Sequence, residues 1–148
     1  MGCMWSAIYY SIIYERISYE FWLNIESLGS LDYIMGFQDY NTKRISFYWG
    51  TSGYRVQIKS NSDIIEGVAT TCADVCGQWI HVTLQIVSTS MKLHLNGLKV
   101  QDKSVTNMAF GSTNKYIVMG NPSNKGSFYM RNLIWWSFNG YLSDAFIR

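Results

Sequence analysis

The chain has 148 residues, of which 48% are hydrophobic, 15% charged and 16% aromatic, with a formal net charge of +2. This balance excludes an intrinsically disordered chain, and the lack of any Lys/Arg run gives no footprint for a nucleic-acid backbone. A chain of this length can bury about two thirds of its unfolded surface, so we expect one domain with its own core.

The first residues of the sequence allow two interpretations. Met1-Gly2 and Ser6 fit a myristoylation pattern, to which Cys3 could add a palmitoyl group. We favour the alternative, in which the match is chance or the numbering starts inside a larger gene product. The apolar run at 5–14 is too short to span a bilayer and lacks a basic leader, so it predicts neither a signal peptide nor a membrane-spanning segment. We interpret it as a strand.

Alternating apolar and polar residues, together with a single proline at Pro122 and many Tyr, Ile, Val, Thr and Ser residues, predict short strands throughout the chain. In the strand after the first, odd-numbered residues from Tyr19 to Ile25 form an apolar face, and even-numbered ones from Glu20 to Glu26 form the other. No long helical period occurs, and only the connection at 101–115 is expected to hold a short helical turn. We expect strands at 9–14, 17–25, 33–37, 44–49, 54–59, 64–69, 79–86, 91–95, 98–100, 116–119, 128–136 and 141–147.

The clearest alternation belongs to a predicted hairpin. Even-numbered residues from Ile80 to Ile86 are apolar, and so are the odd-numbered residues from Met91 to Leu95. Both sets stay on one face only if Ile86 pairs with Met91 or with Leu93, because a slip of one residue would turn the second set into water. The sequence therefore predicts a tight hairpin with one of two registers.

Asn96–Gly97 extends this hairpin into a three-strand meander, because both residues tolerate the positive φ angles of a type I′ turn. Trp79, which opens the meander, is expected to fill the core beside Gly77. His81 and His94 share the polar face, near enough across the hairpin for a metal pair. Without a carboxylate cluster nearby, we favour two solvated or backbone-bonded imidazoles.

Three cysteines give little information about the compartment. Cys72 and Cys76 are close enough for a local disulfide, which would leave Cys3 unpaired, but two ordinary thiols fit equally well. A zinc site is disfavoured, because the sequence has no second cysteine pair and only two histidines.

Four segments of the chain follow one another in a specific order: the strand ISYEFWLNI at 17–25, the Trp-x-His-Val strand with its hairpin and Asn-Gly turn at 78–100, a strand ending in Gly at 116–120, and the Gly-x-hydrophobic-x-Asp pattern at 140–144. This order resembles the laminin G-like and pentraxin-like group of concanavalin A-like domains. The resemblance covers about residues 17–148, and its motifs are more specific for the fold than for any activity. It implies an all-β fold, a two-sheet antiparallel jelly-roll sandwich, as one domain over 1–148 that is expected to be a module of a larger protein.

Loops at one edge of the sandwich are the first candidate sites, because members of the resembled group often bind carbohydrate or a partner protein there, and many hold calcium. The resemblance directs attention to Asp39 and Asn41 as calcium ligands and to Asn121 and Asn124 as ligand-binding residues. Calcium takes about 6–8 oxygen ligands. Only Asp39 is anionic and basic residues crowd the same loops, so we favour polar turns without an ion and assign no cofactor.

Adjacent aromatic residues are the second candidate site. Trp135 and Trp136 must point to opposite faces of a strand, so one of them could reach the surface and stack on a sugar ring or dock against a protein. The same argument applies to Tyr48 and Trp49, which makes Trp49 a further candidate. Burial under a loop or at an edge is the favoured alternative at both places.

Catalysis is not expected, although glycan hydrolases share this architecture. Such enzymes need two carboxylates about 5–10 Å apart, whereas Glu20 and Glu26 share a face but lie about 20 Å apart along a strand. The sequence predicts a non-catalytic binding or assembly module in an extracellular or cell-surface structure, with other protein subunits or further copies of itself as partners. The alternative is a lectin-like domain that binds glycan through edge loops and an exposed aromatic.

Overall fold

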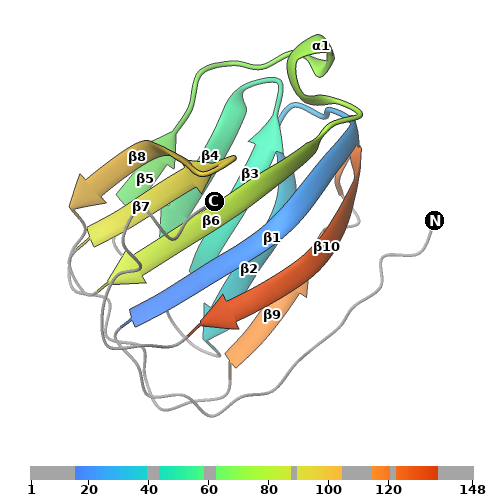
Figure 1. The fold of residues 1–148 in the computed structure, drawn as a ribbon. Helices are drawn as coiled ribbons and strands as arrows, with labels where there is room; N and C mark the ends of the chain where they lie inside the picture. Colours follow the sequence, from blue (N-terminus) through green and yellow to red (C-terminus); the bar gives the residue numbers. More distant parts are fainter. Residues whose placement is uncertain are drawn as a thin grey trace.

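The computed structural model describes residues 16–39, 44–58, 63–87, 90–104, 115–120 and 123–136. These residues form ten strands in two five-stranded sheets, in which every pairing is antiparallel. Figure 1 shows one sheet lying in front of the other. The predicted all-β, two-sheet sandwich is therefore confirmed.

The front sheet has the strand order β10-β1-β6-β7-β8, and the back sheet has the order β5-β4-β3-β2-β9. The front strands are β10 (Ser127–Trp136), β1 (Arg16–Ser27), β6 (Trp79–Val87), β7 (Ser90–Leu95) and β8 (Leu98–Ser104). The back strands are β5 (Asp63–Glu66), β4 (Gly53–Ile58), β3 (Arg44–Gly50), β2 (Asp32–Asp39) and β9 (Lys115–Met119). The predicted strands at 9–14 and 141–147 lie outside the described residues.

The hydrophobic core lies between the two sheets. On β1 the predicted apolar face is confirmed, since Tyr19, Phe21, Leu23 and Ile25 are each at most 2% exposed. Phe21 meets Phe47 of the back sheet edge-on, with ring centroids 5.9 Å apart. Full burial of such a side chain contributes about 1.5–3 kcal/mol to folding. The inward-facing residues of the alternating strands therefore stabilise the packing of the two sheets.

The meander has the predicted register. Ile86 pairs with Met91, the first of the two alternatives. Asn96 and Gly97 have φ angles of 51° and 79°, as a type I′ turn requires. The third strand, β8, continues to Ser104, further than the apolar pattern predicts.

The cysteine loop contains a one-turn helix, α1 (Cys72–Val75), and a disulfide joins Cys72 to Cys76. Four residues are too few to show a helical period, so the sequence does not predict this helix. The loop is tied to β1, because the backbone N–H of Gly77 donates to the carbonyl of Ile25 at 2.8 Å. Within the described ranges no helix has the length and apolarity that crossing a membrane requires.

Asp32 joins the turn after β1 to the loop before β10. Its side chain is 6% exposed, and its carboxylate accepts backbone N–H bonds from Gly29, Lys125 and Gly126 at 2.8, 2.9 and 2.8 Å. A Cβ atom on Gly29 or Gly126 would collide with this carboxylate, so both close approaches require glycine. This carboxylate fixes the start of β10, the strand that completes the front sheet.

Burial makes Tyr19 sensitive to alkaline pH. Burial, and secondarily the nearby Tyr33, raise the pKa of the Tyr19 hydroxyl well above its ordinary value. The folded chain therefore keeps this proton at a pH where the unfolded chain loses it. The resulting stabilisation is complete below the unfolded pKa of about 10 and is lost as pH rises toward the folded pKa.

We expect the free energy of unfolding to fall above about pH 10, and to fall less steeply in Tyr19→Phe, which has no proton to lose there. Urea denaturation of both proteins between about pH 8 and 11 measures the two slopes. Equal slopes would contradict the proposed contribution of Tyr19.

Candidate functional site

Aromatic and charged side chains gather on the outer face of the front sheet, where β6, β1 and β10 lie side by side (Figure 1). Residues that pair across antiparallel strands point to the same face, so each row of the pairing presents its side chains together. Two adjacent rows form the surface that we name the aromatic patch: Trp79, Asn24 and Tyr129 in one, and His81, Trp22 and Arg131 in the other.

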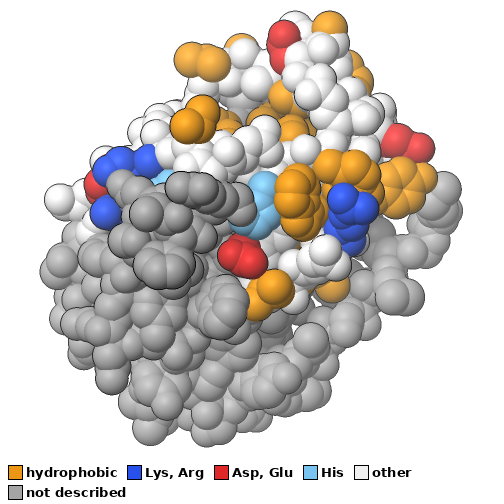
Figure 2. Space-filling view, in the orientation of Figure 1, with side chains coloured by type: hydrophobic (Ala, Val, Ile, Leu, Met, Phe, Trp, Pro, Cys, Tyr) orange, Lys and Arg blue, Asp and Glu red, His pale blue; other side chains and the backbone are white. Residues whose placement is uncertain are grey.

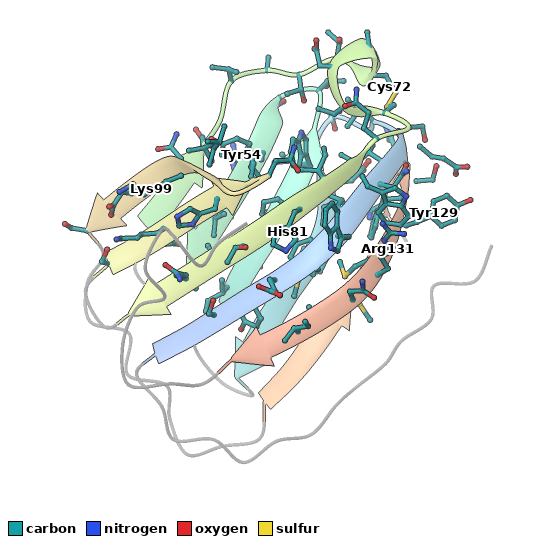
Figure 3. All side chains as sticks on the ribbon, in the orientation of Figure 1. Tyr54, Cys72, His81, Lys99, Tyr129 and Arg131 are labelled. Atoms are coloured by element: carbon teal, nitrogen blue, oxygen red, sulfur yellow. A yellow bond between two sulfur atoms is a disulfide. The ribbon has the colours of Figure 1, made fainter. Side chains whose placement is uncertain are left out.

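The row of the aromatic patch that contains Trp79 and Tyr129 is exposed to solvent. Trp79 is 37% exposed and Tyr129 is 49% exposed. Figure 2 shows hydrophobic side chains around a cationic one on this face, and Figure 3 labels Arg131 and Tyr129 there on β10. Trp22 and Asn24 are half-buried between the two outer strands. The surface therefore offers indole and phenol rings together with polar groups.

Arg131 is held by the two indoles. Its guanidinium carbon lies 4.0 Å from the ring centroid of Trp79 and 5.7 Å from that of Trp22. The ring of Trp22 in turn contacts His81, with centroids 4.9 Å apart. Cation–π contacts at exposed sites contribute about 0.5–1 kcal/mol, which favours a position of the guanidinium over the face of the Trp79 ring.

Glu26 fixes the edge of the patch. Its two carboxylate oxygens accept hydrogen bonds from the hydroxyls of Tyr129 and Ser127, each at 3.1 Å. The hydrogen bond to Glu26, and then the negative charge of that carboxylate, raise the pKa of Tyr129. Tyr129 therefore stays protonated and is oriented by a neighbouring strand.

The prediction that Trp79 fills the core is wrong. Ile80 points inward on β6, so the preceding residue points outward, into the row that contains Asn24. The same alternation was visible in the sequence, since His81 and Trp79 have the same parity. On β10, parity also places Tyr129 and Arg131 opposite the partly buried Met130. Sequence reasoning missed these patch residues, and alternation was the signal that could have placed them on the outer face.

Of the two alternatives expected for the histidines, solvated or backbone-bonded imidazoles, the solvated one is wrong. His81 and His94 are both buried, although they belong to the polar face of the meander. The residues described here contain no group of three or more His, Cys, Asp or Glu side chains that could hold a metal ion. The backbone N–H of His81 donates to the side-chain oxygen of Asn96 at 2.9 Å, which ties the turn to β6.

Asn124 has a structural role. Its amide donates to the carbonyl of Tyr33 at 2.8 Å and accepts the N–H of Tyr33 at 3.0 Å, as a neighbouring strand would. Each end of the side-chain amide thus makes one bond to β2, as the favoured alternative of a polar turn expects. That Asn124 also binds a ligand stays a prediction.

The other loop predictions fall outside the described residues. Asn41 and Asn121 lie there, and so does the side chain of Asp39, whose backbone pairs with Lys115 at the end of β2. Calcium binding by Asp39 and Asn41, and ligand binding by Asn121, therefore stay predictions.

Trp49 is not a surface aromatic. It is 3% exposed, packs edge-on against Phe47 and Tyr54, and donates its indole N–H to the hydroxyl of Thr70 at 3.1 Å. The half-buried Tyr48 takes the opposite face of β3. The parity argument is confirmed, but the ligand-binding role predicted for Trp49 is wrong.

Trp135 and Trp136 end β10, where their backbones pair with Tyr19 and Ser18 of β1. Their side chains lie outside the described part of the structure. The prediction that one of them contacts a ligand therefore stays a prediction.

Comparison with known proteins agrees with this architecture. A family model described as the concanavalin A-like lectin/glucanases superfamily, of the laminin G type, matches residues 14–144. No curated protein matches the chain.

Among solved structures, the binding domain of botulinum neurotoxin serotype D has a TM-score of 0.63 and 16% identity, covering 92% of this chain and 35% of that one. Domain 4 of AbnA, an extracellular arabinanase from Geobacillus stearothermophilus in complex with arabinotriose, has a TM-score of 0.64 and 18% identity. The match covers 95% of this chain and 70% of that domain. The heptameric SAP-like pentraxin from Limulus polyphemus has a TM-score of 0.61 and 14% identity. The match covers 85% of this chain and 66% of the pentraxin chain. The chain thus spans about a third of the toxin domain, and identities this low indicate a shared fold alone.

Proposed function

The chain belongs to the concanavalin A-like lectin/glucanases superfamily, and from this premise we propose that it is a non-catalytic module that binds carbohydrate through the aromatic patch. The observation that carries the proposal is the row in which Trp79, 37% exposed and with the guanidinium of Arg131 over one face of its ring, lies beside Asn24. An indole packs well against the C–H face of a sugar ring, while neighbouring amide and guanidinium groups bind its hydroxyls. The arabinotriose named with the arabinanase domain supports the same ligand class.

The polar groups of the patch are available for a ligand. Within the described residues, the side chains of Asn24 and Arg131 make no hydrogen bond or ion pair. Asn24 lies between Trp79 and Tyr129 in its row, so its amide flanks both rings. A sugar lying on this row would meet an aromatic surface and hydrogen-bonding groups together.

The spacing of the carboxylates near the patch supports the non-catalytic part of the proposal. Glu26 already binds two hydroxyls on β10, and Glu20 lies six residues away on the same strand, about 20 Å along its length. Glycoside hydrolysis requires carboxylates about 5–10 Å apart. These two groups are too distant to act as such a pair.

Contact with another protein subunit is the second candidate function. It is supported by the edge strand β8, where Leu98 and Val100 are exposed at 72% and 37%. An exposed edge can pair with another chain. We rank it second because these residues carry no polar groups that would specify a partner, whereas the aromatic patch combines rings, an amide and a cation.

We further propose that the domain is one module of a larger protein at the cell surface or outside the cell. The disulfide between Cys72 and Cys76 supports this setting, because disulfides persist in oxidising compartments.

Replacing Trp79 with alanine tests the proposed function. We expect the affinity for an oligosaccharide selected on a glycan array to fall by about thirtyfold or more, because the exposed ring is the main contact surface. Isothermal titration calorimetry with the full chain measures the dissociation constant.

The matched control is Leu98→Ala, which removes an exposed apolar side chain from β8, at the far side of the front sheet. Its affinity should equal that of the wild type. Binding that survives in Trp79→Ala, or that is lost in Leu98→Ala, would contradict recognition at the aromatic patch.

A further inference from the structure

We propose that the aromatic patch selects saccharides that carry a carboxylate group, and that Arg131 is the residue that recognises it. This inference rests on the proposed function, because the sugar ring would pack on the same surface. It adds a chemical class of ligand and a specificity-determining residue.

The geometry of Arg131 fits this role. Its guanidinium lies over the ring of Trp79 at 4.0 Å, so the ring covers one face of the group. The N–H donors of a guanidinium lie in its own plane and point away from such a contact. The donors are therefore held in a defined direction at the surface, where a planar carboxylate can accept two parallel hydrogen bonds.

Arg131 has no ion-pair partner among the described residues, and neither has Lys125, whereas three other described cations are paired. Arg55 is paired with Glu66, and Lys92 and Lys99 are both paired with Asp102. No carboxylate of the described residues pairs with Arg131.

Glu26, the carboxylate at the edge of the patch, does not supply the missing partner. One of its oxygens accepts the hydroxyl of Tyr129 and the other accepts that of Ser127. Among the described residues, Arg131 is therefore a positive charge that lies against aromatic rings without a carboxylate partner, and we infer that an external anion pairs with it.

The arrangement favours an acidic sugar over a free anion or an acidic peptide. A sugar acid presents a carboxylate beside a C–H ring face, and the patch presents a guanidinium beside the exposed ring of Trp79. The amide of Asn24 in the same row can bind a ring hydroxyl. A peptide carboxylate would use the charge of Arg131 but would leave the ring and the amide without complementary groups.

Matched pairs of acidic and neutral saccharides test the inference. The probes are sialyllactose against lactose and trigalacturonate against galactotriose, which separate the two sources of a sugar carboxylate. Titration calorimetry with the full chain should give an affinity about ten- to a hundredfold higher for the acidic member of at least one pair, as expected for a charge-assisted bond.

Arg131→Gln should remove this preference, because it should lower the affinity for the acidic sugar about tenfold or more beyond any loss of affinity for the neutral sugar. Arg131→Lys keeps the charge but loses the planar fork, so it should restore only part of the preference. Arg55→Gln is the matched control, since it removes the same charge from β4 of the back sheet, and it should leave the preference unchanged.

The outcomes separate this inference from the function on which it rests. Neutral and acidic sugars that bind equally, with both lost in Trp79→Ala, would overturn the role of Arg131 and leave the proposed function standing. Polyglutamate that binds as tightly as the acidic sugar and depends equally on Arg131 would also overturn it, because charge alone would then suffice. Failure of every saccharide to bind the wild-type chain would contradict the proposed function itself.

Discussion

Replacing Phe21 with alanine is expected to lower the free energy of unfolding by about 3–5 kcal/mol. Phe21 is 1% exposed on β1, the strand between β10 and β6, and its ring meets that of Phe47 across the two sheets. The change removes a large apolar group from the contact between the sheets, and the surrounding strands cannot close the space because their hydrogen bonds fix them. The loss therefore combines a transfer term with a cavity term.

Urea denaturation, followed by circular dichroism, measures this effect. Leu98→Ala serves as a matched truncation at a site that is 72% exposed, and its stability should stay within about 0.5 kcal/mol of the wild type. Equal effects of the two substitutions would mean that the interior of the sandwich does not lie between the sheets as described.

Replacing Asp32 with alanine is expected to lower the free energy of unfolding by about 3–4 kcal/mol. Three backbone N–H groups, of Gly29, Lys125 and Gly126, lose their acceptor at once. Hydrogen bonds to charged groups contribute about 1.5–3 kcal/mol each, and water will replace part of what is lost. The turn after β1 and the loop before β10 should loosen together.

Asp32→Asn distinguishes loss of the acceptor from loss of packing, because the side chain keeps its size and one oxygen. We expect its stability to lie between those of the wild type and Asp32→Ala. Hydrogen exchange of the Gly126 amide supplies a local readout, which should accelerate in both variants. A loss below about 1 kcal/mol in Asp32→Ala would contradict the role of this carboxylate.

The meander was predictable because its contacts are local in sequence. The pairing of Ile86 with Met91 and the positive φ angles at Asn96 and Gly97 follow from alternation and from turn chemistry between neighbouring strands. Both signals lie within the segment that they describe. The sequence therefore predicted these strands and narrowed their register to two alternatives, of which the structure has the first.

The tendency of tryptophan to pack in a core predicts a buried Trp79, whereas the alternation of its own strand predicts an outward side chain. The polar face of β6 includes His81, and Trp79 has the same parity, so the period of the strand decided its direction. The cost of exposing the ring is reduced by Arg131, which covers it from β10. That contact was invisible without the pairing of β10 with β1.

Long-range pairing accounts for the rest of the site. The two rows of the aromatic patch exist because β1 lies between β6 and β10, which follow it by more than fifty residues. The same is true of Asn124, which reaches Tyr33 across 91 residues. Local patterns in the sequence carry no information about which distant strands become neighbours, so the bonds of Asn124 to the backbone of β2 could not be predicted.

The most direct test of saccharide recognition at the aromatic patch is nuclear magnetic resonance of the isotope-labelled full chain during titration with an oligosaccharide that binds. The indole N–H signals of Trp79 and Trp22 and the side-chain signal of Arg131 should shift together and saturate, while the signal of the buried Trp49 stays in place. Saturable shifts centred on the 38–43 and 120–127 loops, with these three patch signals unchanged, would contradict the account.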